Sequence, residues 1–193
     1  MRFLERRILK DGRALDGNIL LVDSFLNHQV DMPLMREIGV AFAEHFRPFQ
    51  ITRIVTVESS GIAPAGMTAL ELGVPLVIFK KFASRVASGR FYQVNVQSFT
   101  KSTQYELTAS KVYLPKGERV LFIDDFLAMG EAAIGVSTIM KEAKCELAGI
   151  GIVIEKTFQP GRARLDEMGL YVFSLARIEA MSPESIRFVA SDA

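Results

Sequence analysis

Two adjacent aspartates, Asp124 and Asp125, stand where an apolar run meets a loop of small residues in the segment RVLFIDDFLAMGEAAIGV. The run predicts a buried strand, and the residues after the loop predict a helix. Unpaired backbone N–H groups at such a helix entrance can bind a phosphate. Carboxylates repel phosphate, so we expect the two aspartates to bind sugar hydroxyls, a cation or a substrate-borne Mg²⁺ beside it. The loop residues are Ala128, Met129, Gly130, Glu131 and Ala132. The competing interpretation is an acidic strand end followed by a helix cap.

A second candidate anion loop follows the apolar run of IVTVESSGIAPAGMTAL and contains Ser59, Ser60 and Gly61. The segment GIAPAGMT is one residue away from the nucleotide-binding pattern G-x-x-x-x-G-K-[ST], because Met67 occupies the place of the lysine. Loss of that charge argues against an ATPase and leaves a smaller anion loop. An ordinary turn with a serine helix cap is the competing interpretation. Two anion loops at strand ends favour a substrate that carries two phosphate groups.

Two further strand ends carry cations. Lys80 and Lys81 end the apolar run that precedes them, and Lys156 follows the very apolar LAGIGIVI. Phe158 lies two residues beyond Lys156, and a cation beside an aromatic ring suits a planar polar ligand. Lysines at a strand end are otherwise solvated, and a phenylalanine is by default a packing residue.

The elements that must position these groups follow a repeating pattern. Five apolar runs, residues 51–57, 74–79, 120–123, 147–154 and 170–175, alternate with helix-like segments such as 62–72 and 131–144. This alternation predicts an α/β fold with a parallel, twisted sheet that is covered by helices on both faces. Ligands bind beyond the carboxyl ends of the strands in such sheets.

Three other segments complete the expected organisation. Residues 1–12 predict an amphipathic helix, and a second helix begins after Asp31 as its cap, with Pro33 in the first turn. Residues 84–110 are polar and partly alternating, which indicates an antiparallel β excursion of the kind that often serves as a flexible lid.

Composition sets limits on function. The chain has 193 residues with 23 Lys and Arg against 22 Asp and Glu, so we expect one domain, no nucleic-acid partner and no membrane span. Cys145 is the only cysteine, which favours a reducing cytoplasmic location over a disulfide scaffold. His28 and His45 are too few for a His-rich zinc site, and no protein-held metal is expected.

The motifs together resemble a known family. IDDFLAMGEAA resembles the phosphoribosyl pyrophosphate motif of type I phosphoribosyltransferases, and VDSFLNHQVD, VESSGIAPA, SFTK and GIGIVIEKTFQPGR extend the similarity to the bacterial xanthine-using members. The resemblance implies a type I phosphoribosyltransferase fold over residues 1–193, with residues 1–30 and the C-terminal segment forming a small hood. It also implies transfer of a phosphoribosyl group to N9 of xanthine, with Mg²⁺ bound through phosphoribosyl pyrophosphate. Members are typically cytoplasmic homodimers of purine salvage.

The resemblance also implies residue roles. The loop of residues 128–132 would bind the 5′-phosphate, Asp124 and Asp125 the ribose hydroxyls, and Ser59, Ser60, Gly61 and Lys81 the pyrophosphate. Leu20, Asn27 and Lys156 would contact xanthine. Many relatives have hydroxyl side chains in the phosphate loop, and the xanthine-using members often have Asn where this chain has Met129, so phosphate binding here must rest on backbone donors.

Two alternatives stay open at this stage. A small change in the hood could favour hypoxanthine or guanine over xanthine. A nucleotide-sensing regulator on the same fold would be a different class, and it would usually add a DNA-binding domain or a basic face. Retention on heparin at low salt would distinguish a regulator from this near-neutral chain.

Overall fold

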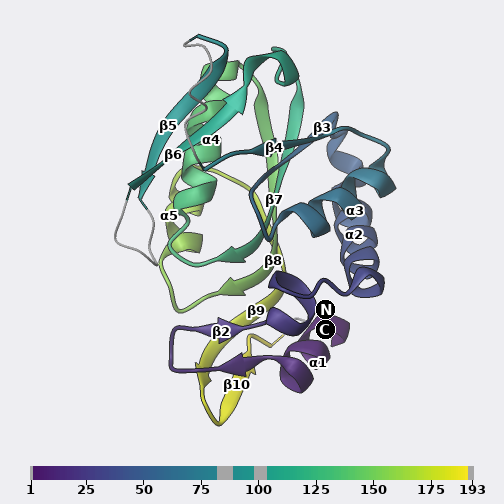
Figure 1. Ribbon diagram of the computed structural model, residues 1–193, viewed down its shortest axis with the longest axis vertical. Coiled ribbons are helices and arrows are strands. Elements are labelled where there is room, and N and C mark those ends of the chain that lie inside the picture. The colour runs from purple at the N-terminus through teal and green to yellow at the C-terminus, as the bar shows by residue number, and fades with distance from the viewer. Residues whose placement is uncertain (1, 82–88, 98–103, 191–193) are drawn as a thin grey trace.

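A six-stranded sheet forms the centre of the molecule in the computed structural model, which describes residues 2–81, 89–97 and 104–190 (Figure 1). Its strand order is β10-β9-β8-β7-β3-β4, and every neighbouring pair is parallel except β9 and β10. The strands are β3 (Arg53–Val57), β4 (Leu76–Phe79), β7 (Arg119–Leu127), β8 (Glu146–Lys156), β9 (Val172–Ser182) and β10 (Ser185–Phe188). The five apolar runs are thus confirmed as parallel strands. The antiparallel edge strand β10 was not predicted, because its short SIRF segment has no continuous apolar run.

Helices cover both faces of this sheet (Figure 1). The α-helices are α1 (Arg2–Asp11), α2 (Met32–Phe46), α3 (Ile62–Leu72), α4 (Glu131–Ala143) and α5 (Gly161–Glu167), and the short helical turns are η1 (Asp23–Asn27), η2 (Arg47–Phe49) and η3 (Lys111–Tyr113). Alternate residues of a strand point to opposite faces, so Ile54 joins the core with α2 and α3 while Val55 joins the core with α4. Among the helices of the described residues, none has the length and apolarity to cross a membrane.

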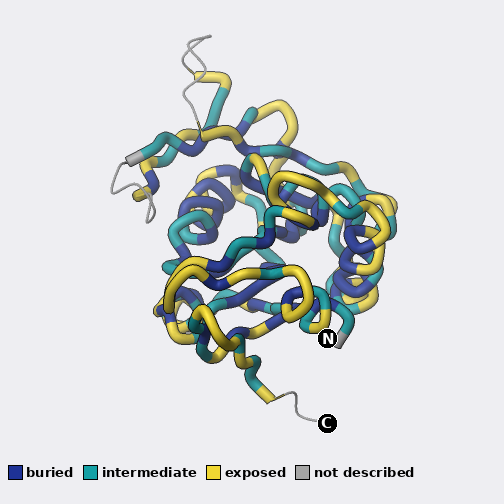
Figure 2. The backbone as a smooth tube through the Cα atoms, turned by 60° about the horizontal axis from the view of Figure 1, so that its bottom comes forward, coloured by how far each residue is buried: buried dark blue, intermediate teal, exposed yellow. Residues whose placement is uncertain are grey.

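Burial follows this layered arrangement. Buried residues concentrate in the sheet and on the inward sides of the flanking helices, whereas exposed residues gather in the connecting loops (Figure 2). Gly39 on α2 allows α2 and α3 to pack closely, because a Cβ there would lie 2.5 Å from Cβ of Met67 on α3.

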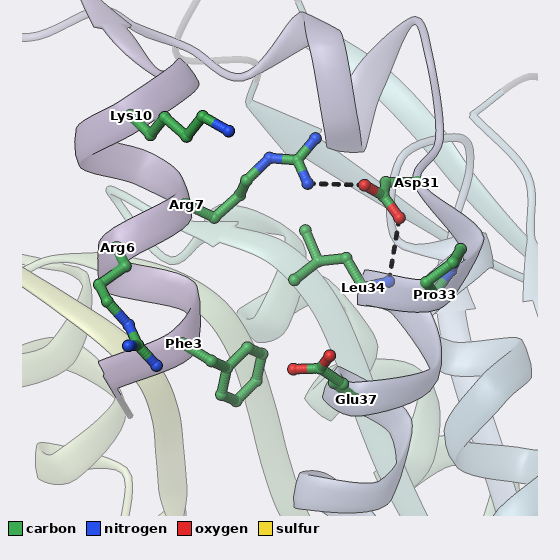
Figure 3. Close-up of a pocket in the computed structure, with 8 residues that line it drawn as sticks. All are labelled: Phe3, Arg6, Arg7, Lys10, Asp31, Pro33, Leu34 and Glu37. Atoms are coloured by element: carbon green, nitrogen blue, oxygen red, sulfur yellow. Dashed lines mark hydrogen bonds and ion pairs between the residues drawn. The ribbon is translucent and has the colours of Figure 1, made fainter.

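The entry of α2 is fixed by the residues that the sequence indicated. Asp31 caps the helix by accepting a hydrogen bond from the backbone N–H of Leu34 at 3.1 Å. Its other carboxylate oxygen lies 2.6 Å from Nη1 of Arg7, which reaches across from α1 (Figure 3). These contacts hold the pKa of Asp31 below its usual range, and they join α1 to the start of α2.

A small antiparallel pair, β1 (Arg13–Ala14) and β2 (Leu20–Leu21), lies with α1 and η1 beyond the carboxyl ends of the central strands (Figure 1). The connection between β1 and β2 contacts the sheet directly, since Nζ of Lys156 at the end of β8 donates a hydrogen bond to the carbonyl oxygen of Asn18 at 2.6 Å. The N-terminal segment therefore covers the edge at which ligands are expected.

The predicted excursion contains the antiparallel strands β5 (Phe91–Gln97) and β6 (Gln104–Ser110). Val96 and Leu107 are buried, and a Cβ at Gly135 of α4 would lie 2.6 Å from Cγ2 of Val96. The described part of the excursion is thus anchored on α4. Residues 82–88 and 98–103, which include the SFTK motif and much of the expected lid, lie outside the described residues.

Candidate active site

The two aspartates lie inside β7 rather than after it, because the strand continues to Leu127. Pairing with β3 stops at Phe122, whereas pairing with β8 continues through Asp124 to Leu127. From Ile123 onward, β7 therefore has no strand pairing on the side of β3. Asp124 and Asp125, which are intermediate in exposure, lie on this open edge at the carboxyl end of the sheet, where the sequence predicted a ligand.

The surroundings of the aspartates disfavour their charged forms. Burial raises the pKa of both carboxyl groups, and the adjacent carboxylate of Asp125 raises that of Asp124 further. Each carboxylate accepts a backbone hydrogen bond, from the N–H of Asp125 to Asp124 and from the N–H of Phe126 to Asp125, both at 3.0 Å. Two poorly solvated acceptors at an open strand edge are suited to binding hydroxyl donors.

The loop of residues 128–132 is folded tightly against the start of α5. Gly130 has a φ of +83°, which favours glycine, and a Cβ there would lie 3.3 Å from Cα of Gly161. Gly161 in turn donates its N–H to the carbonyl oxygen of Ala128 at 2.9 Å, and its own Cβ would lie 2.3 Å from that oxygen. Both glycines are needed for this contact, so the EKTFQPGR segment supports the 128–132 loop, a role that the sequence did not indicate.

The first turn of α4 begins at Glu131, and Gly130 is its N-cap residue with no side-chain cap hydrogen bond. Arg164 of α5 donates from Nη1 to the carbonyl oxygen of Met129 at 2.5 Å and to Oε1 of Glu131 at 2.6 Å. Sequence analysis missed Arg164, because its partners lie more than thirty positions earlier in the chain.

The second loop lies against the same carboxylates. Gly61 is buried, and a Cβ there would lie 2.4 Å from Oγ1 of Thr56 and 3.1 Å from Oδ1 of Asp124. Only a residue without a side chain fits, which explains the glycine after the two serines. Gly61 rather than a serine is the N-cap residue of α3, so the serine-cap interpretation is wrong.

The two lysines that follow β4 differ in their contacts. Lys80 is paired through Nζ with Oε2 of Glu58 at 2.9 Å, while Lys81 donates its backbone N–H to Oε1 of the same residue at 2.8 Å. Burial opposes ionisation of Glu58, but these donors hold its pKa below the usual range. The ammonium group of Lys81 lies 5.7 Å from the ring centre of Tyr105 and faces the site.

Two adjoining cavities bring these groups together. One, of about 190 Å³, is lined by the 128–132 loop, and the other, of about 140 Å³, is lined by Glu58, Ser59, Ser60 and Asp125. Lys81, Asp124 and Ala132 line both. The structure therefore joins the two predicted anion loops and the aspartates into one site.

The larger of these two cavities is also lined by two residues that the sequence did not indicate. Tyr105 and Gln97 reach it from the β5–β6 excursion, and burial raises the pKa of Tyr105 to about 12. Neutral and half-buried, the phenol is a hydrogen-bond donor near Lys81. The sequence did not indicate Tyr105, because its place beside Lys81 depends on a contact between residues far apart in the chain.

None of the three residues expected to contact a base, Leu20, Asn27 and Lys156, lines either of these cavities. Lys156 lies at the end of β8, where burial lowers the pKa of its ammonium group, and the ring 5.2 Å from its Nζ is that of Phe126. Phe158, which the sequence suggested for that position, is 40% exposed. Leu20 is buried in the core and Asn27 is exposed at the end of η1, and neither lines the two cavities described above.

A third hollow, of about 400 Å³, lies between α1 and α2 (Figure 3). Its Arg7 already pairs with Asp31 and with Asp11, each at 2.6 Å. The hollow shares no lining residue with the two smaller cavities, and the Arg7–Asp31 ion pair within it joins α1 to the start of α2. We therefore assign the chemistry to the smaller cavities.

Comparison with known proteins identifies the family. The phosphoribosyl transferase domain matches residues 30–185. Xanthine phosphoribosyltransferase 1 of Clostridium botulinum is 54% identical over 98% of this chain and 100% of that protein. Xanthine phosphoribosyltransferase of Agathobacter rectalis is 50% identical over 98% of each, and that of Bacillus cereus is 47% identical over 100% of this chain and 98% of that protein.

Solved structures give the same fold at lower sequence identity. Adenine phosphoribosyltransferase of Thermoanaerobacter pseudethanolicus has a TM-score of 0.76 and 21% identity, over 90% of this chain and 99% of that one. The Saccharomyces cerevisiae enzyme, complexed with an iminoalditol bisphosphate and adenine, has a TM-score of 0.75 and 23% identity, over 91% and 99%. The predicted α/β fold is confirmed, and the chain belongs to the phosphoribosyltransferase family, as an enzyme grouped with the xanthine phosphoribosyltransferases.

Proposed function

We propose that this enzyme transfers the 5-phosphoribosyl group from phosphoribosyl pyrophosphate to xanthine, giving xanthosine 5′-monophosphate and pyrophosphate. The bond between C1 of the ribose and the pyrophosphate oxygen breaks, a bond from C1 to N9 of xanthine forms, and the N9 proton is released. The names of the relatives at 47–54% identity support xanthine as the base.

The observation that carries this proposal is the junction of two cavities through Lys81 and Asp124. A substrate with phosphate groups at both ends of one ribose needs two anion loops separated by groups that bind hydroxyls. We assign the 5′-phosphate to the backbone N–H groups of residues 128–132 and the helix start that follows. The pyrophosphate belongs to Ser59, Ser60, Gly61 and Lys81, where the ammonium group offsets charge on the leaving group.

The two aspartates then bind the ribose. Displacement at C1 gives the sugar oxocarbenium character, and a carboxylate near the ring stabilises developing positive charge. In the enzyme with bound substrate, hydroxyl groups replace the water that Asp124 and Asp125 have lost. Orientation of both reactants and exclusion of water provide the remaining rate enhancement, so no protein nucleophile is required.

The base is assigned to Lys156, Asn27 and Leu20 at the boundary between β8 and the N-terminal hood. The contact between Lys156 and the carbonyl of Asn18 supports this, since it connects the strand end to the hood. An ammonium group beside the 6-oxo group would favour the xanthine anion and strengthen N9 as a nucleophile. Phe126, next to Lys156, adds an aromatic face suited to a planar base.

Mg²⁺ enters as part of the substrate in this proposal. The ion takes oxygen ligands, and it is commonly bound through one or two carboxylates together with phosphates of a substrate. Asp124 and Asp125 beside the two cavities fit that donor set. Bound Mg²⁺ supplies charge neutralisation on the phosphate oxygens.

We further propose that the chain acts as one domain over residues 1–193, with residues 1–30 and the C-terminal segment as the hood. A cytoplasmic homodimer is the form we expect. The single cysteine, Cys145, supports a reducing compartment. Sedimentation or light scattering would measure the assembly.

Product analysis tests the function. Purified enzyme is incubated with xanthine, phosphoribosyl pyrophosphate and Mg²⁺, and both products are measured by chromatography and a pyrophosphate assay. We expect equal amounts of xanthosine 5′-monophosphate and pyrophosphate, with neither formed when a chelator removes Mg²⁺. Release of pyrophosphate without the nucleotide would indicate hydrolysis and would contradict the proposal.

A further inference from the structure

Glu131 presents an electrostatic problem for the proposed 5′-phosphate site, on which this inference rests. Its backbone N–H belongs to the set that would bind the phosphate, yet this acidic residue lines the same cavity. A carboxylate at that position repels a phosphate dianion, and in a partly buried site the repulsion is only weakly screened by water. An acidic residue in the first turn of a helix is favourable for the helix itself but competes with an anionic ligand there.

Arg164 compensates the charge of this carboxylate. Its Nη1 atom lies 2.6 Å from Oε1 of Glu131, and the two side chains are 36% and 29% exposed. The pair is therefore partly shielded from solvent, where an ion pair is more effective than at the surface. The guanidinium group cancels the carboxylate charge and leaves the backbone N–H groups to act on the phosphate.

The same arginine also orients the loop. Its Nη1 donates to the carbonyl oxygen of Met129, and the N–H of Gly161 donates to the carbonyl oxygen of Ala128. The C=O and N–H of one trans peptide point in opposite directions, so both contacts turn the N–H groups of Met129 and Gly130 away from α5. Residues of α5, all of which are described, do not line the cavity that the loop borders.

We propose that Arg164 is a positioning residue that neutralises Glu131 and thereby permits an acidic residue in the loop that receives the 5′-phosphate. It acts through Glu131 and Met129 and does not touch the reacting atoms. The neighbouring Arg162 serves a different purpose, because it pairs with Glu155 at 2.6 Å and attaches α5 to the sheet.

Charge compensation makes a distinctive prediction for paired substitutions. Arg164→Ala leaves the Glu131 carboxylate uncompensated, so KM for phosphoribosyl pyrophosphate should rise at least tenfold while KM for xanthine changes little. Glu131→Gln alone leaves the charge of Arg164 without its carboxylate partner beside the loop, so KM for phosphoribosyl pyrophosphate should fall below the wild-type value. The double variant Arg164→Ala with Glu131→Gln should recover to within about threefold of wild type, because no carboxylate then needs compensation and only the hydrogen bond to the carbonyl oxygen of Met129 stays lost.

Two inhibitors locate the effect within the site. Ribose 5-phosphate carries only the phosphate assigned to this loop, and pyrophosphate occupies only the other end. The inhibition constant of ribose 5-phosphate should rise at least tenfold in Arg164→Ala, and that of pyrophosphate should stay within twofold. Arg36→Ala, which removes an exposed arginine on α2, is the matched control and should change neither constant.

The outcomes separate this inference from the proposed function. If wild-type enzyme makes no xanthosine 5′-monophosphate, the function is wrong, whereas the ribose 5-phosphate titration can still be read by calorimetry. If wild type is active but Arg164→Ala keeps its constants, or if Glu131→Gln fails to rescue it, charge compensation is overturned. Circular dichroism monitors folding. If Arg164→Ala does not fold, Arg164→Lys, which retains the charge, replaces it. KM of Arg164→Lys for phosphoribosyl pyrophosphate should stay within threefold of wild type, and a tenfold rise would overturn the proposal.

Discussion

At the scale of residues, a substitution at Asp125 can remove the charge of its carboxyl group while nearly preserving the shape of the side chain. Asp125→Asn keeps the side-chain oxygen that accepts from the N–H of Phe126 but loses the negative charge. A hydrogen bond to a charged group contributes about 1.5–3 kcal/mol, so we expect turnover to fall about tenfold to a hundredfold. Initial rates measure turnover, and circular dichroism shows whether the variant is folded. Wild-type turnover in a folded variant would show that this carboxylate has a structural role only.

The same substitution should stabilise the enzyme without substrate. Burial raises the pKa of Asp125, so the folded state holds a proton that the unfolded chain releases, and stability declines as pH rises from the unfolded value near 3.8 through the raised folded value. The Asp125→Asn variant would lose this part of the decline, because its amide does not titrate in this range, and only the part that comes from the raised pKa of Asp124 would remain. Its melting temperature should exceed that of wild type at pH 7, and the difference should shrink towards pH 4. A lower melting temperature at pH 7 would show that the charge contributes to stability.

Base choice is also decided by single residues. Asn27 is assigned to the 2-oxo and N3–H groups that distinguish xanthine from hypoxanthine, and a mismatch would leave an amide unpaired at about 1–3 kcal/mol. Asn27→Ala should reduce the preference for xanthine more than total activity. Lys156→Ala should instead depress kcat/KM for xanthine, hypoxanthine and guanine together, since all three carry a 6-oxo group. An equal loss for every base in Asn27→Ala would leave Asn27 as a hood-stabilising residue.

The sequence identified site residues where neighbours in the chain carry the signal. Asp124, Asp125 and the 128–132 loop form one continuous motif, and each lines the cavities where it was expected. Tyr105, Phe126 and Arg164 were missed, because their roles depend on contacts with residues distant in the sequence, such as Lys81, Lys156 and Glu131. Short periodic patterns contain no information about such contacts.

At the scale of elements, two glycines of α3 can be compared, Gly61 at its N-cap and Gly66 within the helix. Gly61→Ala would place a Cβ 2.4 Å from Oγ1 of Thr56 and displace the loop from Asp124, whereas a Cβ at Gly66 has no atom within 4 Å. We expect Gly61→Ala to destabilise the protein by about 1–3 kcal/mol and to impair activity. Gly66→Ala should stabilise α3 by about 0.5–1 kcal/mol with unchanged turnover. Chemical denaturation measures both, and equal effects would refute the close packing of Gly61 against the site.

The elements themselves were largely predictable, since buried parallel strands have continuous apolar runs and α2 has both its cap and its proline. Strand ends were less predictable. β7 extends four residues beyond the expected 120–123 run, because pairing with β8 tolerates polar residues where pairing with β3 has already stopped. That extension changes the interpretation of Asp124 and Asp125 from strand-end residues to residues on an open strand edge.

At the scale of the whole molecule, the site is a product of the sheet, the excursion and the N-terminal segment together. The sheet provides the carboxylates, α5 supports the 128–132 loop, and β6 contributes Tyr105. Lys156 connects the sheet to the connection between β1 and β2 through Asn18. Their joint arrangement could be expected from sequence only through family resemblance, because local patterns do not determine how distant segments meet.

The central claim is that this whole arrangement selects xanthine. The most direct measurement is an ultraviolet assay of kcat/KM for xanthine, hypoxanthine, guanine and adenine with saturating phosphoribosyl pyrophosphate and Mg²⁺, since the ratio of these values reports differential binding of the transition states. The account predicts the highest value for xanthine, lower values for hypoxanthine and guanine, and the lowest for adenine, which lacks the 6-oxo group. A higher value for adenine, hypoxanthine or guanine than for xanthine would contradict it.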